Sequence, residues 1–269
     1  MRENIFTNQS VVITGASSGI GRELALQLAR QGARLTLASR QADLLEELAA
    51  ECRSLGGQAT AVPTDVTDRE QCKALIRKAV ETYGKIDMLI NNAGITMWAL
   101  LEEITDLDIF EKIMKVNYLG SVYCTYYALP YLKQSRGRLV AVSSLTGKDG
   151  VPTRSGYAAS KHAMVGFFDS LRVELIGSGV SVTIIYPGFV DTGVQARGFG
   201  PDGRPLGINP LQLNKIMTVQ ECARLSIKAM ADRRREEVMT LRGKLGQWIK
   251  LFAPALVDRI ALKAIREGK

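Results

Sequence analysis

A glycine-rich turn near the amino terminus is the feature that most constrains the fold of this chain. Residues 10–14 (SVVIT) form a β-branched run, GASSGIG follows directly, and RELALQLARQG then shows helical spacing of its apolar residues. Glycine lets a backbone turn tightly beside a ligand, and the first turn of a helix presents N–H groups that no carbonyl accepts. The order of strand, turn and helix therefore predicts a pyrophosphate site built from Gly15, Ser17, Ser18, Gly19 and Gly21.

The same turn also matches a competing motif. Gly15 to Gly19 satisfies G-x-S-x-G, the nucleophile elbow of α/β hydrolases. That interpretation requires an acid and then a histidine further along, and the single histidine of the chain is His162, next to Lys161. An elbow after the first strand would also leave almost no sheet before it, so we favour the dinucleotide interpretation.

Strand-like and helix-like segments alternate along the rest of the chain. Such alternation predicts an α/β fold, here a single doubly wound Rossmann domain with a mostly parallel seven-stranded sheet and helices on both faces. We assign residues 1–242 to this domain and residues 243–269 to an amphipathic helical tail. The strands that follow the first are expected at 33–39, 58–66, 86–94, 137–144, 180–188 and 236–241, and the helices at 41–56, 69–83, two stretches within 106–135, 155–175 and 218–231.

Composition excludes several classes of protein. An apolar content of 46% in 269 residues supports one large core, and no apolar run reaches the roughly 18 residues of a membrane-spanning helix. The amino terminus, MRENIFTNQS, lacks the apolar core of a signal peptide, so we expect a cytoplasmic protein. The four cysteines have no C-x-x-C spacing, which argues against a metal site. The formal charge is +8, but no nucleic-acid module accompanies it.

Polar residues follow the second and third strands at the distance where a dinucleotide's adenosine half is held. Ser39 and Arg40 lie eighteen and nineteen residues past Gly21, where an acid favours NAD and an arginine accommodates the 2′-phosphate of NADP. They indicate NADP(H), unless Arg40 only begins the solvated helix that follows. Asp65 and Val66 end the third strand, where Asp65 either meets the adenine amino group or caps the next helix, which starts near Asp68.

Two further strand ends carry turn-forming residues. Asn91-Asn92-Ala93-Gly94 follows a buried strand, and its amides and glycine either pin the neighbouring backbone or contact a cofactor directly. Pro187-Gly188 ends the strand expected at 180–188. We expect backbone groups at this point to contact the amide of a cofactor. Residues 189–217 are then rich in glycine and proline, and we interpret them as a lid and substrate wall, with Thr192 near the cofactor.

Tyr157 and Lys161 provide candidate acid–base chemistry. They lie four residues apart at the start of a helical segment, so both side chains project from one face. A phenol has a pKa of about 10, and a neighbouring cation favours the phenolate. Ser144 ends the strand-like run GRLVAVSS, where its hydroxyl can hold a substrate oxygen. Taken alone, a Tyr-x-x-x-Lys pair on a helix more often marks solvated surface than chemistry.

Asn117 and the carboxyl-terminal tail each leave alternatives open. A polar amide inside an apolar helix requires a partner, so Asn117 either bonds to backbone or holds water beside Lys161. The tail alternates apolar and basic residues around Pro254 and includes Trp248 and Phe252. It either covers the protein's own surface, packs on a partner subunit or lies in a membrane interface, and the first two outcomes are the commoner ones.

These segments together resemble the short-chain dehydrogenase/reductase family. TGASSGIG at 14–21, NNAG at 91–94, Asn117, Ser144, Tyr157 with Lys161, and PG at 187–188 occur in the family's order and spacing, from Gln9 to Thr192. Within the family, ALPYLKQSRGRLVAVSSLTGK followed by GYAASKHAMVGFFDSLRVEL is similar to the hydroxysteroid dehydrogenase branch and its bacterial relatives. The resemblance implies that Tyr157 is the general acid or base, that Lys161 lowers its pKa and holds the nicotinamide ribose, that Ser144 orients the carbonyl and that Asn117 supports a water relay.

The resemblance also implies a cofactor site and an activity. Its cofactor-binding positions are Gly15, Ser17, Ser18, Gly19, Ile20, Gly21, Ser39, Arg40, Asp65, Val66, Asn92, Ala93, Gly94, Tyr157, Lys161, Pro187, Gly188, Val190 and Thr192. We expect an NADP(H)-dependent oxidoreductase that interconverts a lipophilic ketone and a secondary alcohol and forms a homodimer or homotetramer. The alternatives are a 3-oxoacyl-thioester reductase, which the long basic tail disfavours, and a scaffold or sensor that binds a dinucleotide without catalysis.

Overall fold

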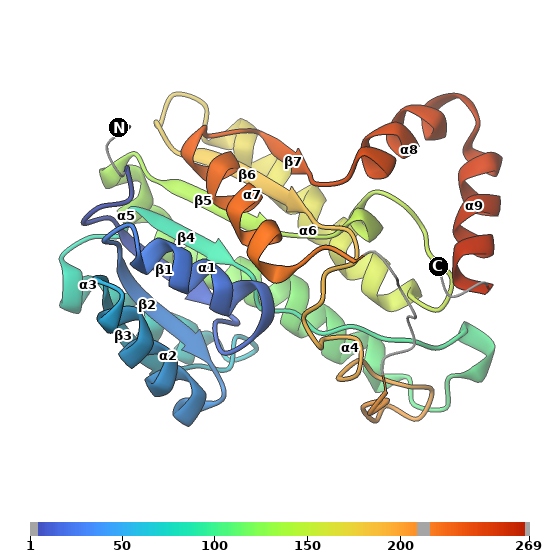
Figure 1. Cartoon of the computed structure of the whole chain (residues 1–269), viewed down its shortest axis with the longest axis horizontal. Coiled ribbons are helices and arrows are strands. Elements are labelled where there is room, and N and C mark those ends of the chain that lie inside the picture. Colours follow the sequence, from blue (N-terminus) through green and yellow to red (C-terminus); the bar gives the residue numbers. More distant parts are fainter. Residues whose placement is uncertain (1–4, 209–215, 267–269) are drawn as a thin grey trace.

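A seven-stranded parallel sheet forms the centre of the molecule in the computed structural model, which describes residues 5–208 and 216–266 (Figure 1). The strand order is β3-β2-β1-β4-β5-β6-β7, and every strand pairing is parallel. This confirms the predicted doubly wound fold. The strands are β1 (Ser10–Thr14), β2 (Arg34–Ser39), β3 (Gln58–Pro63), β4 (Met88–Asn91), β5 (Arg138–Val142), β6 (Ser181–Tyr186) and β7 (Glu236–Val238).

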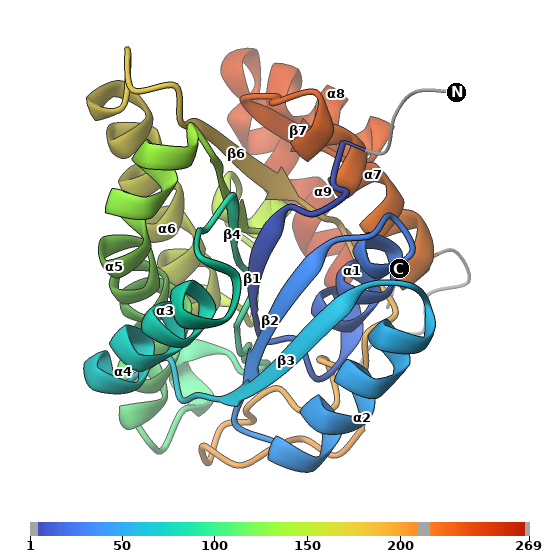
Figure 2. The same ribbon diagram turned by 90° about the vertical axis from the view of Figure 1, so that its left-hand side faces the viewer.

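Helices cover both faces of this sheet (Figure 2). One face carries α1 (Gly19–Ala29), α2 (Ala42–Ser54) and α7 (Val219–Ala231). The other carries α3 (Arg69–Tyr83), α4 (Asp108–Met114), α5 (Gly120–Ser135) and α6 (Ser155–Glu174). The Asp68 carboxylate begins α3 by accepting the backbone N–H groups of Glu70 and Gln71, at 2.8 and 3.1 Å, which is the role of a helix N-cap.

The central strands are buried on both faces, and their alternation divides the core in two. In β1, Val11 and Ile13 pack against Leu24 and Leu28 of α1, whereas Val12 lies in the other layer with residues of α3, α5 and α6. Successive side chains of a strand point to opposite faces, so one β-branched run supplies both layers. This burial fixes the carboxyl ends of the strands along one edge, where α4 and the orange segment after β6 lie (Figure 1).

The predicted pair of helices within residues 106–135 is one continuous helical stretch with an irregular middle. A π-helical segment, η2 (Lys115–Leu119), joins α4 directly to α5. Its wider turn brings Asn117 fully into the interior. Such single π turns commonly occur at functional sites. Two short 3-10 helices, η1 (Leu101–Glu103) and η3 (Leu145–Gly147), follow β4 and β5.

The predicted lid lies close to the loop after β4. Its described part makes isolated bridges from Val190 to Met217 and from Phe199 to Met97. Phe199 accepts a backbone hydrogen bond from Trp98 at 2.8 Å and donates one to Thr96 at 2.9 Å. The lid is therefore tied by backbone pairing to the segment 96–98, and residues 209–215 of the predicted lid lie outside the described residues.

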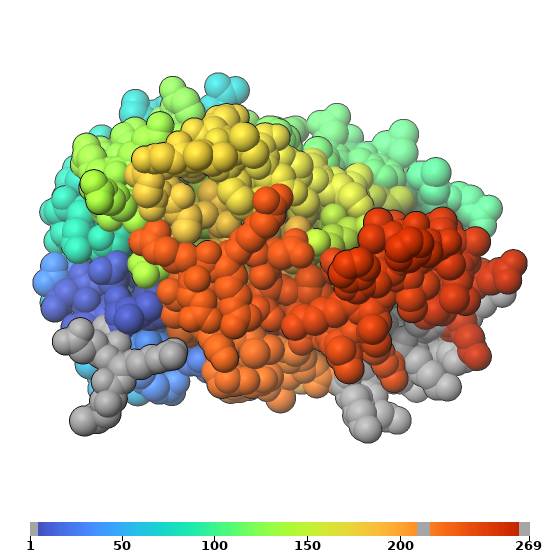
Figure 3. All heavy atoms as spheres, turned by 90° about the horizontal axis from the view of Figure 1, so that it is seen from above, coloured from blue at the N-terminus to red at the C-terminus, as the bar shows by residue number. Residues whose placement is uncertain are grey.

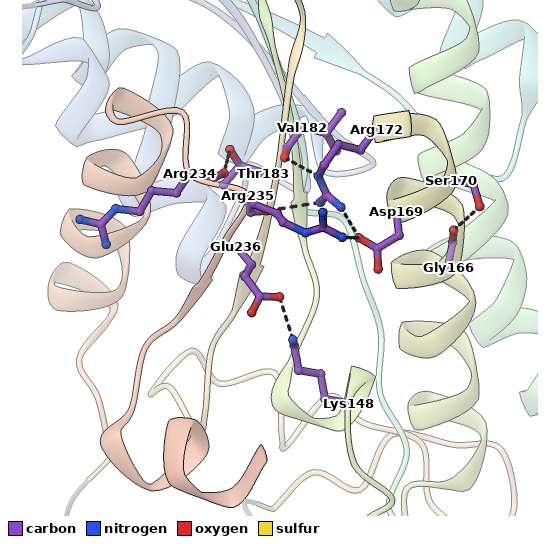
Figure 4. A network of polar contacts seen from close by, with 10 residues as sticks. All are labelled: Lys148, Gly166, Asp169, Ser170, Arg172, Val182, Thr183, Arg234, Arg235 and Glu236. Carbon is purple, nitrogen blue, oxygen red and sulfur yellow. Dashed lines mark hydrogen bonds and ion pairs between the residues drawn. The ribbon is translucent and has the colours of Figure 1, made fainter. Parts of the chain in front are cut away.

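Charged residues fix α6 and the loop after β5 against the last two strands (Figure 4). Arg172 on α6 pairs with Asp169 and donates to the carbonyl of Val182 at 3.2 Å. Lys148, just past η3, pairs with Glu236 of β7 at 2.7 Å. These contacts connect α6 to β6 and connect the loop after β5, which contains Ser144, to β7.

Two helices form the carboxyl-terminal tail, α8 (Leu241–Phe252) and α9 (Pro254–Arg266), and they stand apart from the sheet (Figure 1). In the space-filling view, the red atoms of the tail lie at one end of the molecule (Figure 3). No residue of α8 is buried. Large apolar side chains of both helices face outward, and they are Leu241, Leu245, Trp248, Leu251, Phe252, Leu256, Ile260 and Leu262. The tail therefore leaves its apolar side uncovered in the single chain. Among the described residues, no helix combines the length and the apolar character needed to cross a membrane.

Candidate active site

The glycine turn between β1 and α1 has the geometry of an anion-binding loop. Gly15 and Gly19 have φ angles of +64° and +55°, a region that disfavours residues with a side chain. A Cβ atom at Gly21 would lie 2.4 Å from the Gly15 carbonyl oxygen. Ser18 precedes the helix, and its side chain makes no capping hydrogen bond. The first N–H groups of α1 are thus available to an anion.

Asn92 holds this turn in place. Its side-chain amide donates to the carbonyl oxygens of Thr14 and Gly15 at 3.0 and 3.1 Å. The Thr14 hydroxyl in return accepts the backbone N–H groups of Asn92 and Ala93 at 3.0 and 3.1 Å. Asn92 therefore pins the backbone of the turn, which is one of the two roles that the sequence allowed for it. Thr14, which the sequence analysis did not select, contributes equally.

The end of β2 presents Ser39 and Arg40 near the glycine turn. The Arg40 side chain is exposed, and the Ser39 hydroxyl accepts the backbone N–H of Gln41 at 3.2 Å. Gln41 also accepts a hydrogen bond from the Ser17 hydroxyl at 3.2 Å, so it connects the turn to this strand end. The sequence analysis missed Gln41 because its hydrogen-bond partner, Ser17, lies 24 residues away in the sequence.

Asp65 and Val66 lie at the end of β3 with different surroundings. The Asp65 carboxylate accepts hydrogen bonds from the Thr67 backbone and hydroxyl at 2.9 and 2.8 Å, so it shapes the local turn. Val66 is buried, and a Cβ atom at Gly120 would lie 2.7 Å from its side chain. Capping of α3 falls to Asp68, which leaves Asp65 half-buried at the strand edge.

Asn117 connects the loop after β4 to α6. Its amide nitrogen donates to the Ile95 carbonyl and to the Ser160 hydroxyl, both at 2.9 Å, and its oxygen accepts the Ile95 N–H at 2.8 Å. Asn117 thus bonds to backbone 22 residues away rather than to its own helix. A Cβ atom at Gly94 would lie 3.3 Å from the Asn117 oxygen and 3.6 Å from Lys161 Nζ. Gly94 therefore brings this loop close to the lysine.

Tyr157 and Lys161 lie on one face of α6, as the spacing predicts. Lys161 Nζ is 5.8 Å from the centre of the Tyr157 ring and donates to the Val142 carbonyl at 2.9 Å. The lysine is buried, whereas Tyr157 and Ser144 are half-buried. The Ser144 hydroxyl hydrogen-bonds the Tyr157 side chain and also accepts the Thr146 N–H at 3.2 Å. Phenol, ammonium and hydroxyl therefore share one site beside Asn117.

Burial and charge act in opposite directions on the pKa of Tyr157. Burial raises this pKa because the phenolate loses solvation. The cationic guanidinium of Arg154 and the hydrogen bond of Ser144 lower it. Burial also lowers the pKa of Lys161 to about 8. Arg154, three residues before Tyr157, is therefore the cation that lowers the pKa of the phenol. The sequence analysis did not select this arginine.

Replacing Lys161 by methionine is expected to stabilise the fold by about 1 to 2 kcal/mol at pH 7. The shift of the lysine pKa from 10.5 to about 8 corresponds to a charging cost of about 3 kcal/mol, and the lost bond to Val142 offsets about 1 kcal/mol of this. Below pH 8 both states of the wild type are charged, so the cost is complete. The cost of the buried charge declines between pH 8 and 10.5, where Lys161 is protonated in the unfolded state but neutral in the folded state.

Urea unfolding at pH 7 and pH 10, followed by circular dichroism, measures this effect. The exposed lysine of η2, changed in Lys115→Met, serves as the control and should show no such dependence on pH. Equal gains in stability for Lys161→Met at both pH values would contradict the expected cost of the buried charge.

The segment after β6 returns toward the glycine turn. Pro187 accepts the Leu145 N–H at 3.0 Å, which places Pro187-Gly188 beside η3. A Cβ atom at Gly19 would lie 3.0 Å from the Thr192 side chain. Val190 is buried and pairs with Met217, and Ile20 packs against the core below the turn. Thr192, in the predicted lid, therefore lies against the start of α1.

The predicted residues form two connected groups. One runs from Thr192 through the glycine turn to Asn92, Gly94, Asn117 and Lys161, and the other consists of Ser39, Arg40 and Asp65 at the ends of β2 and β3. The glycine turn excludes side chains from the start of α1, and this space together with the free helix N-terminus fits a pyrophosphate. These residues therefore fit a nicotinamide dinucleotide. Within residues 5–208 and 216–266, no cluster of histidine, cysteine or acidic residues has the arrangement of a metal site.

Known proteins share this sequence and fold. Residues 9–199 match the short chain dehydrogenase family. The chain is 42% identical to 11-beta-hydroxysteroid dehydrogenase-like 2 of Arabidopsis thaliana over 73% of its length, and it spans 64% of that relative. It is 34% identical to dehydrogenase/reductase SDR family protein 7-like of Dictyostelium discoideum, over 97% of this chain and 83% of the relative.

A solved structure agrees with these matches. A short chain dehydrogenase/reductase from Burkholderia phymatum, in complex with NAD, has a TM-score of 0.82 and 25% identity, covering 95% of this chain and 96% of that one. The chain therefore belongs to the short chain dehydrogenase family. Its similarity to the plant proteins places it in the hydroxysteroid dehydrogenase-like branch, as the resemblance in its sequence indicated.

Proposed function

We propose that the protein is an NADP(H)-dependent oxidoreductase that interconverts a ketone and a secondary alcohol. The observation that carries this proposal is the shared position of Tyr157, Lys161 and Ser144 beside Asn117, next to a glycine turn that fits a pyrophosphate. A bound nicotinamide would supply or accept the hydride. Tyr157 would give a proton to the carbonyl oxygen or take one from the alcohol, and Ser144 would hold that oxygen.

The surroundings of Tyr157 support a lipophilic substrate. Its ring packs against an apolar cluster formed by the loop after β4, by α4 and by Phe199 of the lid. Members of this cluster are Ile95, Met97, Ala99, Ile109, Phe110 and Ile113. Apolar walls with a few convergent polar groups are typical of small-molecule sites. The tail argues against the alternative of a 3-oxoacyl-thioester reductase, and the polar set at Tyr157 argues against a binding scaffold.

Initial rates on a panel of ketones, measured with NADPH and with NADH, test this proposal. We expect oxidation of NADPH with at least one apolar ketone and slower rates with NADH at equal concentration. Micromolar affinity for NADPH without turnover of any ketone would instead favour the scaffold or sensor.

We also propose that the tail packs on a second copy of the chain, in a cytoplasmic homodimer or homotetramer. The apolar side of α8 and α9 is open in the single chain, with Trp248 68% and Phe252 85% exposed, while α8 contacts the body of the protein through Lys250, which pairs with Asp149 at 3.1 Å. Contiguous apolar surface of this kind marks an interaction site. The alternative occupant is a membrane interface, which the basic residues of the tail would also suit.

Light scattering at micromolar concentration should give a dimer or tetramer for the intact chain, and Trp248→Ser with Phe252→Ser should lower the mass. Ile176→Ser changes an equally exposed apolar residue at the end of α6 and should leave the mass unchanged. A monomeric intact chain that sediments with anionic vesicles would replace the subunit interface by a membrane contact.

A further inference from the structure

Arg154 is a buried arginine next to the candidate catalytic tyrosine. It precedes the first residue of α6 and lies one helical turn before Tyr157. Its side chain is 4% exposed. Arginine is almost never this buried in a protein unless a carboxylate or another anion pairs with it. Its position and burial therefore require an explanation.

The guanidinium is held by neutral groups. Nη1 donates to the Thr96 hydroxyl at 2.8 Å, and Cζ lies 3.4 Å from the centre of the Trp98 ring. Both partners belong to the segment that pairs with the lid at Phe199. The stacked ring and the hydroxyl fix the charge in position without neutralising it.

Across the part of the chain that the structure describes, Arg154 forms no ion pair, and its Nε and Nη2 atoms make no hydrogen bond. A buried cation of this kind is costly, and burial lowers the pKa of Arg154 to about 10. Charged groups that are buried without a partner occur preferentially at functional sites. The nearest titratable group that benefits from this charge is the phenol of Tyr157, whose ring centre lies 5.6 Å from Cζ.

We propose that Arg154 is a positioning residue for the reaction, a second fixed cation that favours the phenolate of Tyr157 and thereby its exchange of a proton with the substrate oxygen. This inference rests on the proposed function and adds to it. Lys161 lies on the opposite side along the helix, 5.8 Å from the ring, with its ammonium directed to the Val142 carbonyl. Arg154 therefore supplies part of the electrostatic effect that the sequence assigns to Lys161 alone.

Among the described residues, the cations that lie beside the Tyr157 ring are Arg154 and Lys161. The loop after β5 contributes the neutral Ser144, and the loop after β4 and α4 contribute apolar side chains. The pKa of Tyr157 reflects this arrangement, because Arg154 is the foremost influence that lowers it. Removal of the charge should raise that pKa.

The pH dependence of alcohol oxidation tests the inference. We expect the acidic limb of kcat/KM to move up by about one pH unit in Arg154→Met and in Arg154→Gln. At pH values below the limb, this shift corresponds to a loss of kcat/KM of about tenfold. In Arg154→Lys the limb should return to its wild-type pH. Arg172→Met removes a partly buried arginine from the other end of the same helix and should reduce stability without moving the limb. Limbs that coincide in the wild type and both neutral variants would overturn the inference.

A second measurement does not depend on turnover. Labelling with 3-fluorotyrosine lowers the phenol pKa into a range where the fold persists, and Tyr157→Phe assigns the ¹⁹F signal. The apparent pKa of this signal should rise in Arg154→Met and recover in Arg154→Lys. An inactive wild type with a shifted ¹⁹F titration would defeat the proposed function and leave the role of Arg154 intact. An active wild type with an unshifted titration would defeat the role of Arg154 alone.

Discussion

Tyr157→Phe is expected to reduce kcat for ketone reduction by about 10³-fold while leaving NADPH affinity unchanged. The phenol oxygen is the group on α6 that Ser144 bonds and whose pKa Arg154 lowers, and the substitution removes only this oxygen. General acid–base catalysis contributes about 10² to 10⁴ in rate, so its loss should dominate the kinetics. The aromatic ring, which packs against the apolar cluster, is retained.

Steady-state rates and the quenching of tryptophan fluorescence by NADPH measure the two quantities separately. Tyr126→Phe provides a matched control, because this tyrosine is 72% exposed on α5. A variant at Tyr157 that retained more than about a tenth of wild-type turnover would remove the tyrosine from the proton transfer.

Arg40→Asp is expected to reverse the cofactor preference, lowering kcat/KM with NADPH by about 10²-fold and raising it with NADH. Arg40 is exposed at the end of β2, and neither Ser39 nor Gln41 on its two sides carries the acid that would bind a ribose hydroxyl. Hydrogen bonds to charged groups contribute about 1.5 to 3 kcal/mol, which corresponds to about 10- to 150-fold. The new carboxylate would repel the 2′-phosphate and accept a hydrogen bond from the 2′-hydroxyl of NADH.

Initial rates over a range of each cofactor, at a fixed ketone concentration, give the ratio. Arg77→Glu on α3 makes the same change in net charge at an exposed arginine away from the strand ends, and should leave the preference unchanged. If the wild type already prefers NADH, the interpretation of Arg40 is wrong.

The sequence predicts the sheet and the places where its strands end, because these features follow from local pattern. The turn at Gly15 to Gly21 requires glycine for steric reasons, and Asp68 begins a helix through its own side chain. The spacing of Tyr157 and Lys161 likewise determines that they share a helical face. Each inference depends on residues within about one helical turn of one another.

Contacts between distant segments could not be predicted in the same way. Asn117 bonds to Ile95, which is 22 residues away, and the π turn that directs it inward has no pattern of its own. Nothing in the sequence around Arg154 distinguishes it from an ordinary polar residue that precedes a helix. Thr96 and Trp98 contact its guanidinium, and Cζ lies 5.6 Å from the centre of the Tyr157 ring.

The central claim is that the groups gathered around Tyr157 reduce a carbonyl beside a bound dinucleotide. It is tested most directly by incubating the intact protein with NADPH deuterated at C4 of the nicotinamide and the best ketone of the panel, and analysing the product by mass spectrometry and NMR. The account predicts an alcohol with one deuterium on the carbinol carbon, from one of the two C4-deuterated epimers only, formed about 10³-fold more slowly by Tyr157→Phe. An alcohol that carries no deuterium with either epimer, or an equal yield from Tyr157→Phe, would contradict it.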